Sequence, residues 1–274
     1  MELDVFGHAT FCHTADRAIE PDRPTLVLVH GVLNAHKVWL AQADALAAQG
    51  WNVLAPDLPG HLGSRGTPLA SVEDAADFLL ALLDAAGVER AALAGHSFGS
   101  LAALEAAARA PERVTHLVLI GTAFPMKVSP ALLATSLAQP QEAIDKVARY
   151  SHSREAVAAA RQARPLAPTP IDLTRTLMQQ VQASQPQQPL MHIGFQACDQ
   201  YRGGETAMQQ VRCPALFVLG RQDVMTPPEA AASLQARARL GQTALIDGGH
   251  GLMGDNPEGL TAALRAFLPA APAR

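Results

Sequence analysis

The sequence is poor in aromatic residues, cysteine and lysine, and each shortage narrows what the protein can be. Aromatic residues make up 4% of the 274 positions, so Ala, Leu and Val must fill most of any core. The three cysteines (Cys12, Cys198 and Cys213) form no C-x-x-C pair, which argues against a zinc site or a disulfide framework and fits a reducing compartment. Lysine occurs only at positions 37, 127 and 146, which we attribute to coding bias.

Strong positive charge and long apolar runs are also missing. The net charge is −4 and no basic block occurs, so a dedicated nucleic-acid-binding protein is not expected. No apolar stretch reaches the roughly 18 residues of a membrane span. The first residues, Met1 to Asp4, lack the basic and apolar regions of a signal peptide. We therefore expect a cytoplasmic protein without a nucleic-acid or membrane partner; no pattern indicates an oligomeric state.

The residues that are present favour an α/β fold. Hydrophobic residues make up 49% of the chain, enough for one large domain or for a core domain with an inserted lid. Short apolar runs predict strands, and longer segments with helical spacing lie between them. Such alternation is typical of a mostly parallel, doubly wound sheet with crossover helices. The predicted strands are residues 25–29, 51–55, 91–94, 115–120, 215–219 and 243–246, and the predicted helices are 37–49, 71–87, 101–110, 228–240 and 257–268.

The alternation breaks between the fourth and fifth of these strands. Residues from about 124 to 208 show helical patterns, mild Ala/Gln bias and no convincing strand, which predicts a helical cap over one edge of the core. The expected organisation is a core of residues 1–122 and 209–274 with a cap insertion of residues 123–208. Residues 269–274 are expected to form a frayed tail.

Ser97 stands where a predicted strand turns at once into a helix. It lies between two glycines in the sequence Gly95-His96-Ser97-Phe98-Gly99. A turn this sharp needs small neighbours, so that the helix can pass close to the strand, and it holds the serine above the carboxyl edge of the sheet. The backbone N–H of Phe98, at the start of the helix, would point to where an oxyanion forms.

A serine hydroxyl needs a base and an orienting acid, each of which should lie in a loop after a later strand. Asp223 follows the strand at 215–219, and His250 follows the strand at 243–246. Asp247 is a rival acid, but it lies only three residues from His250 at the end of the strand, and we expect it to point elsewhere. The order along the chain is Ser97, Asp223, His250.

With these residues the sequence resembles the α/β-hydrolase superfamily over nearly its whole length. The resemblance implies a Ser97–His250–Asp223 triad, and an oxyanion hole formed by the N–H groups of Phe98 and Val32. The sequence departs from the pattern of this superfamily at two places. Leu62 stands where glycine is common, and Asp255, before Asn256-Pro257, stands where glutamate is common. The motifs that carry the resemblance are His30-Gly31, Asp57-Leu58-Pro59-Gly60-His61, GHSFG, GRQDVMTP and Gly248-Gly249-His250.

Several further residues are candidates for substrate contact. His30 and His96 lie beside the motifs, although His30 is more simply explained as a support for the oxyanion loop, and His96 as a packing or hydrogen-bonding residue. Each cap candidate could equally serve cap packing. The candidates in the predicted cap are Phe124, Met126, Met178, Met191, His192 and Phe195.

The pattern favours a serine hydrolase that acts on a small or medium carboxylic ester or related acyl compound and needs no metal or organic cofactor. Haloalkane dehalogenases and epoxide hydrolases of this fold use aspartate at the elbow, so Ser97 argues against both. A carbon–carbon bond hydrolase, a lyase or a perhydrolase could use the same triad. A non-catalytic binding protein is a third interpretation, although such members often lose a triad residue.

Overall fold

The computed structural model describes residues 1–270, and residues 271–274 of the predicted frayed tail lie outside the described residues. Eight strands form one sheet in the order β1-β2-β4-β3-β5-β6-β7-β8. Strands β3 to β8 pair in parallel, whereas β1 pairs with β2, and β2 with β4, in antiparallel fashion. The strands are β1 (Glu2–Val5), β2 (His8–His13), β3 (Thr25–Val29), β4 (Asn52–Pro56), β5 (Ala91–His96), β6 (Val114–Ile120), β7 (Ala215–Gly220) and β8 (Gly241–Ile246).

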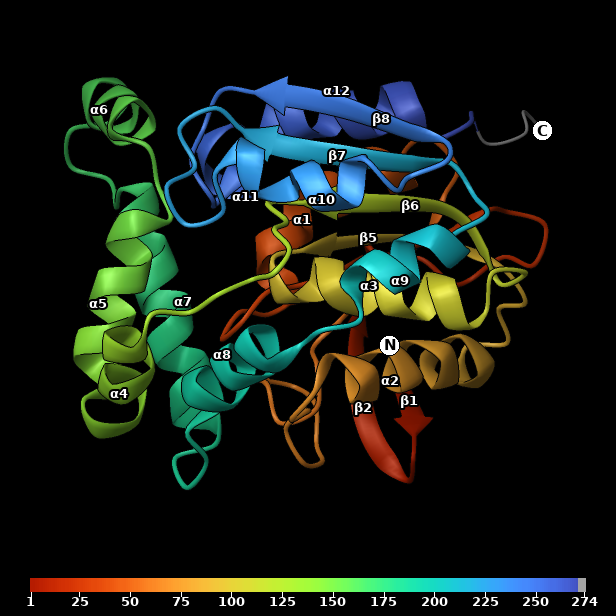
Figure 1. The fold of residues 1–274 in the computed structure, drawn as a ribbon, viewed down its shortest axis with the longest axis horizontal. Coiled ribbons are helices and arrows are strands. Elements are labelled where there is room, and N and C mark those ends of the chain that lie inside the picture. Colours follow the sequence, from red (N-terminus) through yellow and green to blue (C-terminus); the bar gives the residue numbers. More distant parts are fainter. Residues whose placement is uncertain (271–274) are drawn as a thin grey trace.

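Helices cover both faces of the sheet and stand beyond one end of it (Figure 1). The mostly parallel, doubly wound sheet predicted from the sequence is confirmed. The helices and 3₁₀ turns are η1 (His36–Trp39), α1 (Leu40–Ala47), α2 (Val72–Ala85), α3 (Phe98–Arg109), α4 (Pro130–Ala138), α5 (Pro140–Tyr150), α6 (Arg154–Ala163), α7 (Pro170–Ser184), α8 (Leu190–Gln200), α9 (Gly204–Gln210), η2 (Pro228–Ala231), α10 (Ala232–Gln235), α11 (Leu252–Asp255) and α12 (Pro257–Phe267).

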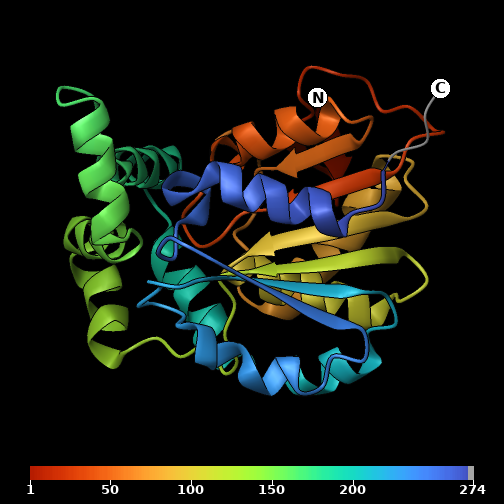
Figure 2. The same ribbon diagram turned by 90° about the horizontal axis from the view of Figure 1, so that it is seen from above.

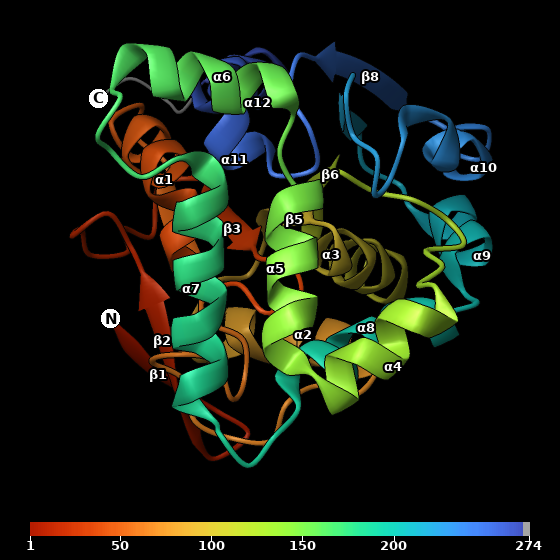
Figure 3. The same ribbon diagram turned by 90° about the vertical axis from the view of Figure 1, so that its left-hand side faces the viewer.

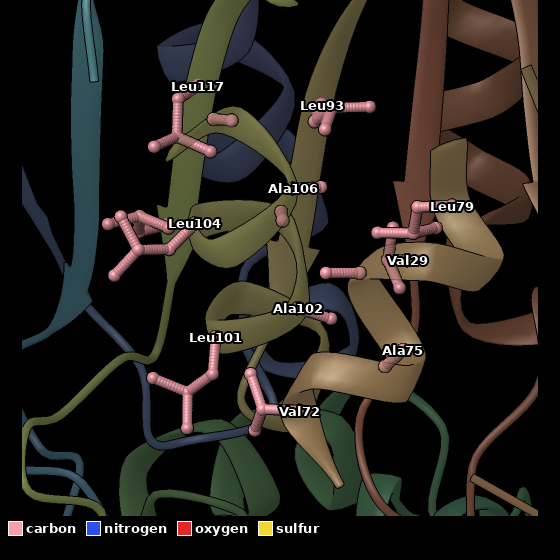
Figure 4. Packing of buried hydrophobic residues seen from close by; sticks show 14 of the residues in the cluster. Val29, Val72, Ala75, Leu79, Leu93, Leu101, Ala102, Leu104, Ala106 and Leu117 are labelled. Atoms are coloured by element: carbon pink, nitrogen blue, oxygen red, sulfur yellow. The ribbon is translucent and has the colours of Figure 1, made fainter. Parts of the chain in front are cut away.

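Helices cover the sheet on both faces (Figure 2), and a hydrophobic core lies between the sheet and the helices on each face. On one face, α1 and α12 bury Leu46 and Leu260 against the sheet. On the other face, α2 and α3 pack against β3, β5 and β6 (Figure 4). Small side chains such as Ala102 and Ala106 let α3 lie close to the sheet, which is how a chain with few aromatic residues reaches a dense core.

Local signals explain where α2 begins and ends. The Ser71 side chain accepts a hydrogen bond from the Asp74 N–H at 3.0 Å, as an N-cap does. Gly87 has φ +65°, and the N–H of Val88 bonds to the carbonyl of Leu83, so the helix ends in a Schellman motif. The sequence predicted Ser71 as the N-cap and Gly87 as the C-terminal stop of this helix, and both are confirmed.

Two elements differ from the prediction. Strands β1 and β2 form an N-terminal hairpin that was not predicted, because its turn uses Phe6 at φ +56° before Gly7 instead of a common turn pair such as Asn-Gly. The predicted helix at 228–240 is wrong beyond Gln235. Beyond Gln235 the chain makes only turn hydrogen bonds, such as those from the N–H groups of Arg237 and Ala238 to the carbonyl of Leu234, before β8 begins at Gly241.

Helices α4 to α9 all lie between β6 and β7, and no strand occurs among them in the described chain. Helices α4 to α7 stand beyond the carboxyl ends of the parallel strands, with α5 and α7 in front of them (Figures 1 and 3). The last helix, α9, packs on α3 and buries Ala207 and Met208 in the core. Within residues 1–270, no helix is both long and apolar enough to cross a bilayer.

Candidate active site

Ser97 occupies a strained turn between β5 and α3. Its backbone has φ +54° and ψ −119°, a conformation that non-glycine residues rarely adopt. A Cβ on Gly95 would overlap the carbonyl of Gly99, and a Cβ on Gly99 would overlap the carbonyl of Val29. The two glycines therefore let the start of α3 lie against β3 and β5. This close approach is what the sequence predicted for the elbow.

The loops after β3 and β6 meet this turn. A Cβ on Gly31 would lie 3.2 Å from the Cβ of Ser97, and a Cβ on Gly121 would lie 3.2 Å from the Nδ1 of His250. Ser97 itself is partly exposed, although its neighbours on both sides are buried. The carboxyl ends of β3, β5 and β6 thus bring Ser97 and His250 to one edge of the sheet.

His250 and Asp223 form a buried pair. The Nδ1 of His250 lies 2.9 Å from Oδ2 of Asp223, and the two side chains are 5% and 0% exposed. The other carboxylate oxygen, Oδ1, accepts the N–H groups of Met225 and Thr226, both at 2.8 Å. The Thr226 hydroxyl lies 2.7 Å from Oδ2 and 2.9 Å from the Nδ1 of His250. Every part of the carboxylate therefore has a partner.

These contacts keep Asp223 ionised. Burial alone would raise the pKa of the carboxyl group, but the charge of His250 and the hydrogen bonds from His250 and Thr226 outweigh it, so the pKa is lowered. The rival acid Asp247 points away: its side chain is 79% exposed and pairs with Arg221 at 3.2 Å. The prediction that Asp247 faces elsewhere is confirmed.

His96 supports the loop of His250 instead of taking up protons. Its Nε2 donates to the carbonyl of His250 at 2.9 Å, and the two rings lie 4.6 Å apart. Burial, followed by the nearby charge of His250, lowers the pKa of His96 to about 3. A neutral ring with its proton on Nε2 fits these contacts, and its Nδ1 is buried without a partner among the described residues.

His30 fixes the loop that carries Val32. Its Nε2 accepts the N–H of Leu58 at 3.0 Å, so its Nδ1 holds the proton and donates to the carbonyl of Gly31 at 2.9 Å. The side chain is fully buried, and burial, followed by the charge of His61, lowers its pKa to about 3. His30 thus ties the loops after β3 and β4 together, in keeping with its structural interpretation.

The two predicted oxyanion donors lie at the start of α3 and just after β3. Phe98 is the first residue of α3, where backbone N–H groups have no partner inside the helix. Val32 follows Gly31, whose Cβ position abuts Ser97. Among residues 1–270, neither the Phe98 N–H nor the Val32 N–H has a hydrogen-bond partner.

Two cavities open at Ser97 and His250. The first, called the α7 cavity, has a volume of about 440 Å³ and is walled by residues such as Leu173 and Leu177 of α7. The second, the α4 cavity, has a volume of about 500 Å³ and is walled by residues such as Ala131 and Leu132 of α4. The residues common to both cavities are Val32, Ser97, Val147, Phe195, Met225 and His250.

The candidate substrate-contact residues fall into two groups. Met126, Met178, Phe195 and His96 line one or both cavities. The described walls of the two cavities do not include His30, Phe124, Met191 or His192. The Nδ1 of His192 instead contacts the Ser136 hydroxyl at 3.0 Å inside the insertion, and Phe124 packs edge-on against Tyr201.

A second buried Asp–His pair was missed by the sequence analysis. Oδ1 of Asp255 lies 2.6 Å from Nδ1 of His152, and Nε2 of His152 lies 2.7 Å from the Thr174 hydroxyl on α7. Oδ2 of Asp255 accepts the N–H groups of Ser153 and Gly249, both at 2.8 Å. The insertion is therefore anchored to the loop of His250. Asp255 stood out in the sequence as a departure, but nothing there paired it with His152.

Comparison with known proteins identifies the family. A profile described as alpha/beta hydrolase fold matches residues 24–257, so the chain belongs to the α/β-hydrolase family. It is 44% identical over 103 residues to a pimeloyl-[acyl-carrier protein] methyl ester esterase from Aromatoleum aromaticum, covering 37% of this chain and 38% of that one. It is 28% identical over 261 residues to a putative carbamate hydrolase from Caulobacter sp., covering 90% and 91%.

Solved structures agree on the fold. The enol-lactonase from Burkholderia xenovorans LB400 superimposes with a TM-score of 0.83 at 19% identity, covering 97% of this chain and 99% of that one. The chain spans only about a quarter to two fifths of the length of several curated relatives that it matches. The relatives and neighbours named here are hydrolases and esterases, in keeping with an enzyme of the α/β-hydrolase family.

Proposed function

We propose that the protein is a serine hydrolase that cleaves a small or medium carboxylic ester, or a related acyl compound, through Ser97, His250 and Asp223. One observation carries the proposal: Ser97 stands on a strained turn at the point where both cavities meet the buried His250–Asp223 pair. A strained non-glycine residue that the surrounding packing maintains is commonly part of a mechanism.

The first step would be attack by the Ser97 hydroxyl on the acyl carbon. Because Nδ1 of His250 faces Asp223, its Nε2 is the nitrogen left to accept the serine proton. The ionised Asp223 would hold the imidazole in this tautomer and stabilise the imidazolium that forms. The unpartnered N–H groups of Phe98 and Val32 would bind the oxyanion of the tetrahedral intermediate.

Collapse of that intermediate would expel the alcohol, which takes its proton from His250, and leave an acyl group on Ser97. A water molecule deprotonated by His250 would then attack the acyl-enzyme, and the acid would leave with Ser97 restored. No step requires a metal or an organic cofactor.

The reaction class draws on the relatives. Their printed names describe a methyl ester esterase, a putative carbamate hydrolase and an enol-lactonase, all of which break a bond at an acyl carbon. The two cavities have room for an organic molecule of small or medium size. A carbon–carbon bond hydrolase, a lyase or a perhydrolase would use the same three side chains, so the choice of substrate in the test must discriminate between them.

The test is a series of p-nitrophenyl esters of increasing acyl length with the wild-type protein and Ser97→Ala. We expect turnover with an optimum in chain length, and a loss of about a thousandfold or more in kcat in the variant. Equal turnover by the variant, or no turnover of any ester by the wild type, would contradict the esterase proposal and favour the alternatives.

A further inference from the structure

Apart from histidines, the titratable side chains that carry charge on the described walls of the two cavities are all lysines. The protein carries 25 Asp and Glu residues and a net charge of −4, yet none of its acidic residues lies on the described walls of either cavity. All three lysines of the chain do lie there. Lys37 lines the α7 cavity, whereas Lys127 and Lys146 both line the α4 cavity. Coding bias can explain why lysines are few, but it does not explain why all three lie on the cavity walls.

The walls of the α4 cavity include both buried apolar residues and exposed cationic residues. Met126 and Phe195 are buried and Leu132 is half-buried, whereas the side chains of Lys127 and Lys146 are 56% and 47% exposed. The two lysines come from different segments: Lys127 precedes α4 and Lys146 lies on α5. The same cavity therefore offers apolar contact on its buried walls and positive charge on the part of its wall that solvent reaches.

The present partners of these lysines are easily exchanged. The Nζ of Lys146 lies 2.6 Å from Glu142 on the same helix, and the Nζ of Lys127 lies 3.6 Å from Asp199. The Lys146–Glu142 pair is solvent-exposed and the Lys127–Asp199 pair partly so, and ion pairs in contact with solvent contribute little to stability. A substrate anion that enters the cavity can replace or share these carboxylates without leaving a buried charge unpaired. By contrast, the α7 cavity has one lysine, and its Nζ contacts the Gln180 side chain at 3.3 Å.

We propose that the substrate is an ester with two arms, of which one is neutral and occupies the α7 cavity, and the other is apolar with a terminal carboxylate and occupies the α4 cavity. The carboxylate would lie between Lys127 and Lys146. This inference rests on the proposed function, because it requires Ser97 to act at the junction of the two cavities.

Three matched esters test the proposal. p-Carbamoylphenyl hexanoate is neutral on both arms, p-carboxyphenyl hexanoate carries a carboxylate on the alcohol arm, and mono-p-carbamoylphenyl adipate carries one on the acyl arm. We expect kcat/KM for one of the anionic esters to exceed that for the neutral ester by about tenfold at low salt. A tenfold preference is the effect expected when a carboxylate contacts two exposed ammonium groups. The preference should decline as salt is added.

The lysine variants locate the effect. In the double variant Lys127→Met/Lys146→Met, the ratio of anionic to neutral kcat/KM should fall to about one. The control is the double variant Arg237→Met/Arg239→Met, which removes the same charge outside the described walls of both cavities and should keep the wild-type ratio. A ratio lost in Lys37→Met but kept in the double lysine variant would overturn the assignment to the α4 cavity.

The outcomes separate the inference from the proposed function. Equal kcat/KM for the three esters would overturn the anionic arm and leave the hydrolase intact. A preference for the neutral ester would do the same. Absence of hydrolysis of all three by the wild type, with the p-nitrophenyl series also inert, would overturn both.

Discussion

At the scale of single residues, Asp223 shows how much of the site depends on one side chain. Its two oxygens receive the N–H groups of Met225 and Thr226, the Thr226 hydroxyl and the ring of His250. Four contacts on a fully buried carboxylate fix the loop after β7 as well as the histidine. The same contacts lower the pKa of Asp223, so the group is charged at neutral pH.

Replacement of Asp223 by asparagine should remove the negative charge of the side chain while keeping its shape. The asparagine side chain would keep the volume but present an amide, so the imidazole of His250 would lose its anion and could adopt the other tautomer. We expect Asp223→Asn to reduce kcat by about 10³–10⁴-fold with little change in KM. Steady-state kinetics with a p-nitrophenyl ester measures this, and Asp247→Asn, which alters the exposed rival acid, is the control. A loss of less than tenfold would argue against the assigned role of Asp223.

At the scale of elements, the site depends on how β5 meets α3 and on how the insertion meets the loop of His250. Gly95 and Gly99 allow the first contact, because a Cβ at either position would overlap a backbone carbonyl. The second contact is made by His152 and Asp255, together with a 2.6 Å hydrogen bond from the N–H of Gly251 to the carbonyl of Ser151.

Disruption of the contact between His152 and Asp255 should reduce catalysis, although neither residue belongs to the proposed triad. In Asp255→Asn the amide group would face one of three donors, from His152, Ser153 or Gly249, instead of accepting from all of them. We expect the free energy of unfolding to fall by about 2 kcal/mol and kcat to fall by about tenfold or more, because the His250 loop would lose its anchor.

The control for Asp255→Asn is Thr174→Val, which removes only the hydroxyl beside Nε2 of His152 and should have a smaller effect on both quantities. Urea unfolding and ester kinetics measure the two effects. A variant that loses stability but retains the wild-type kcat would show that the contact is structural alone.

Elements with a local signal could be predicted from the sequence, and contacts between distant segments could not. The elbow at Ser97 is recognisable because Gly95 and Gly99 lie two residues before and after it, and α2 because Ser71 and Gly87 mark its ends. The hairpin of β1 and β2 lacks a typical turn pair. The contact between His152 and Asp255 joins residues 103 positions apart, and no local pattern links them. The ends of β6, β7 and β8 could be predicted from the sequence. Asp223 and His250 were therefore placed correctly in loops that follow strands.

At the scale of the whole molecule, the fold gathers buried histidines that stay neutral. His30 and His96 are 0% and 4% exposed, and burial lowers the pKa of each from 6.5 to about 3. In the unfolded chain both would regain the ordinary value. Between pH 6.5 and about 3 the unfolded state therefore binds two more protons than the folded state. The free energy of unfolding should have its full value above pH 6.5 and should decline as the pH falls below 6.5.

This linkage predicts an acid-sensitive protein. Each histidine contributes about 1.4 kcal/mol per pH unit well below pH 6.5, so the free energy of unfolding should fall by about 4 kcal/mol between pH 7 and pH 5. Urea unfolding at a series of pH values measures the loss. His96→Asn should remove about half of it, whereas His8→Asn, on an exposed residue of β2, should leave it unchanged. A stability that does not vary from pH 7 to pH 5 would contradict the neutral state of both rings.

The most direct test of the central claim is covalent labelling of the intact protein with a fluorophosphonate, followed by mass spectrometry of the digested chain. The account predicts one adduct, on Ser97, that is absent in Ser97→Ala and forms far more slowly in His250→Asn, because the serine then lacks its base. An unlabelled wild-type protein, or an adduct on another residue that persists in Ser97→Ala, would contradict the assignment of Ser97 as the nucleophile.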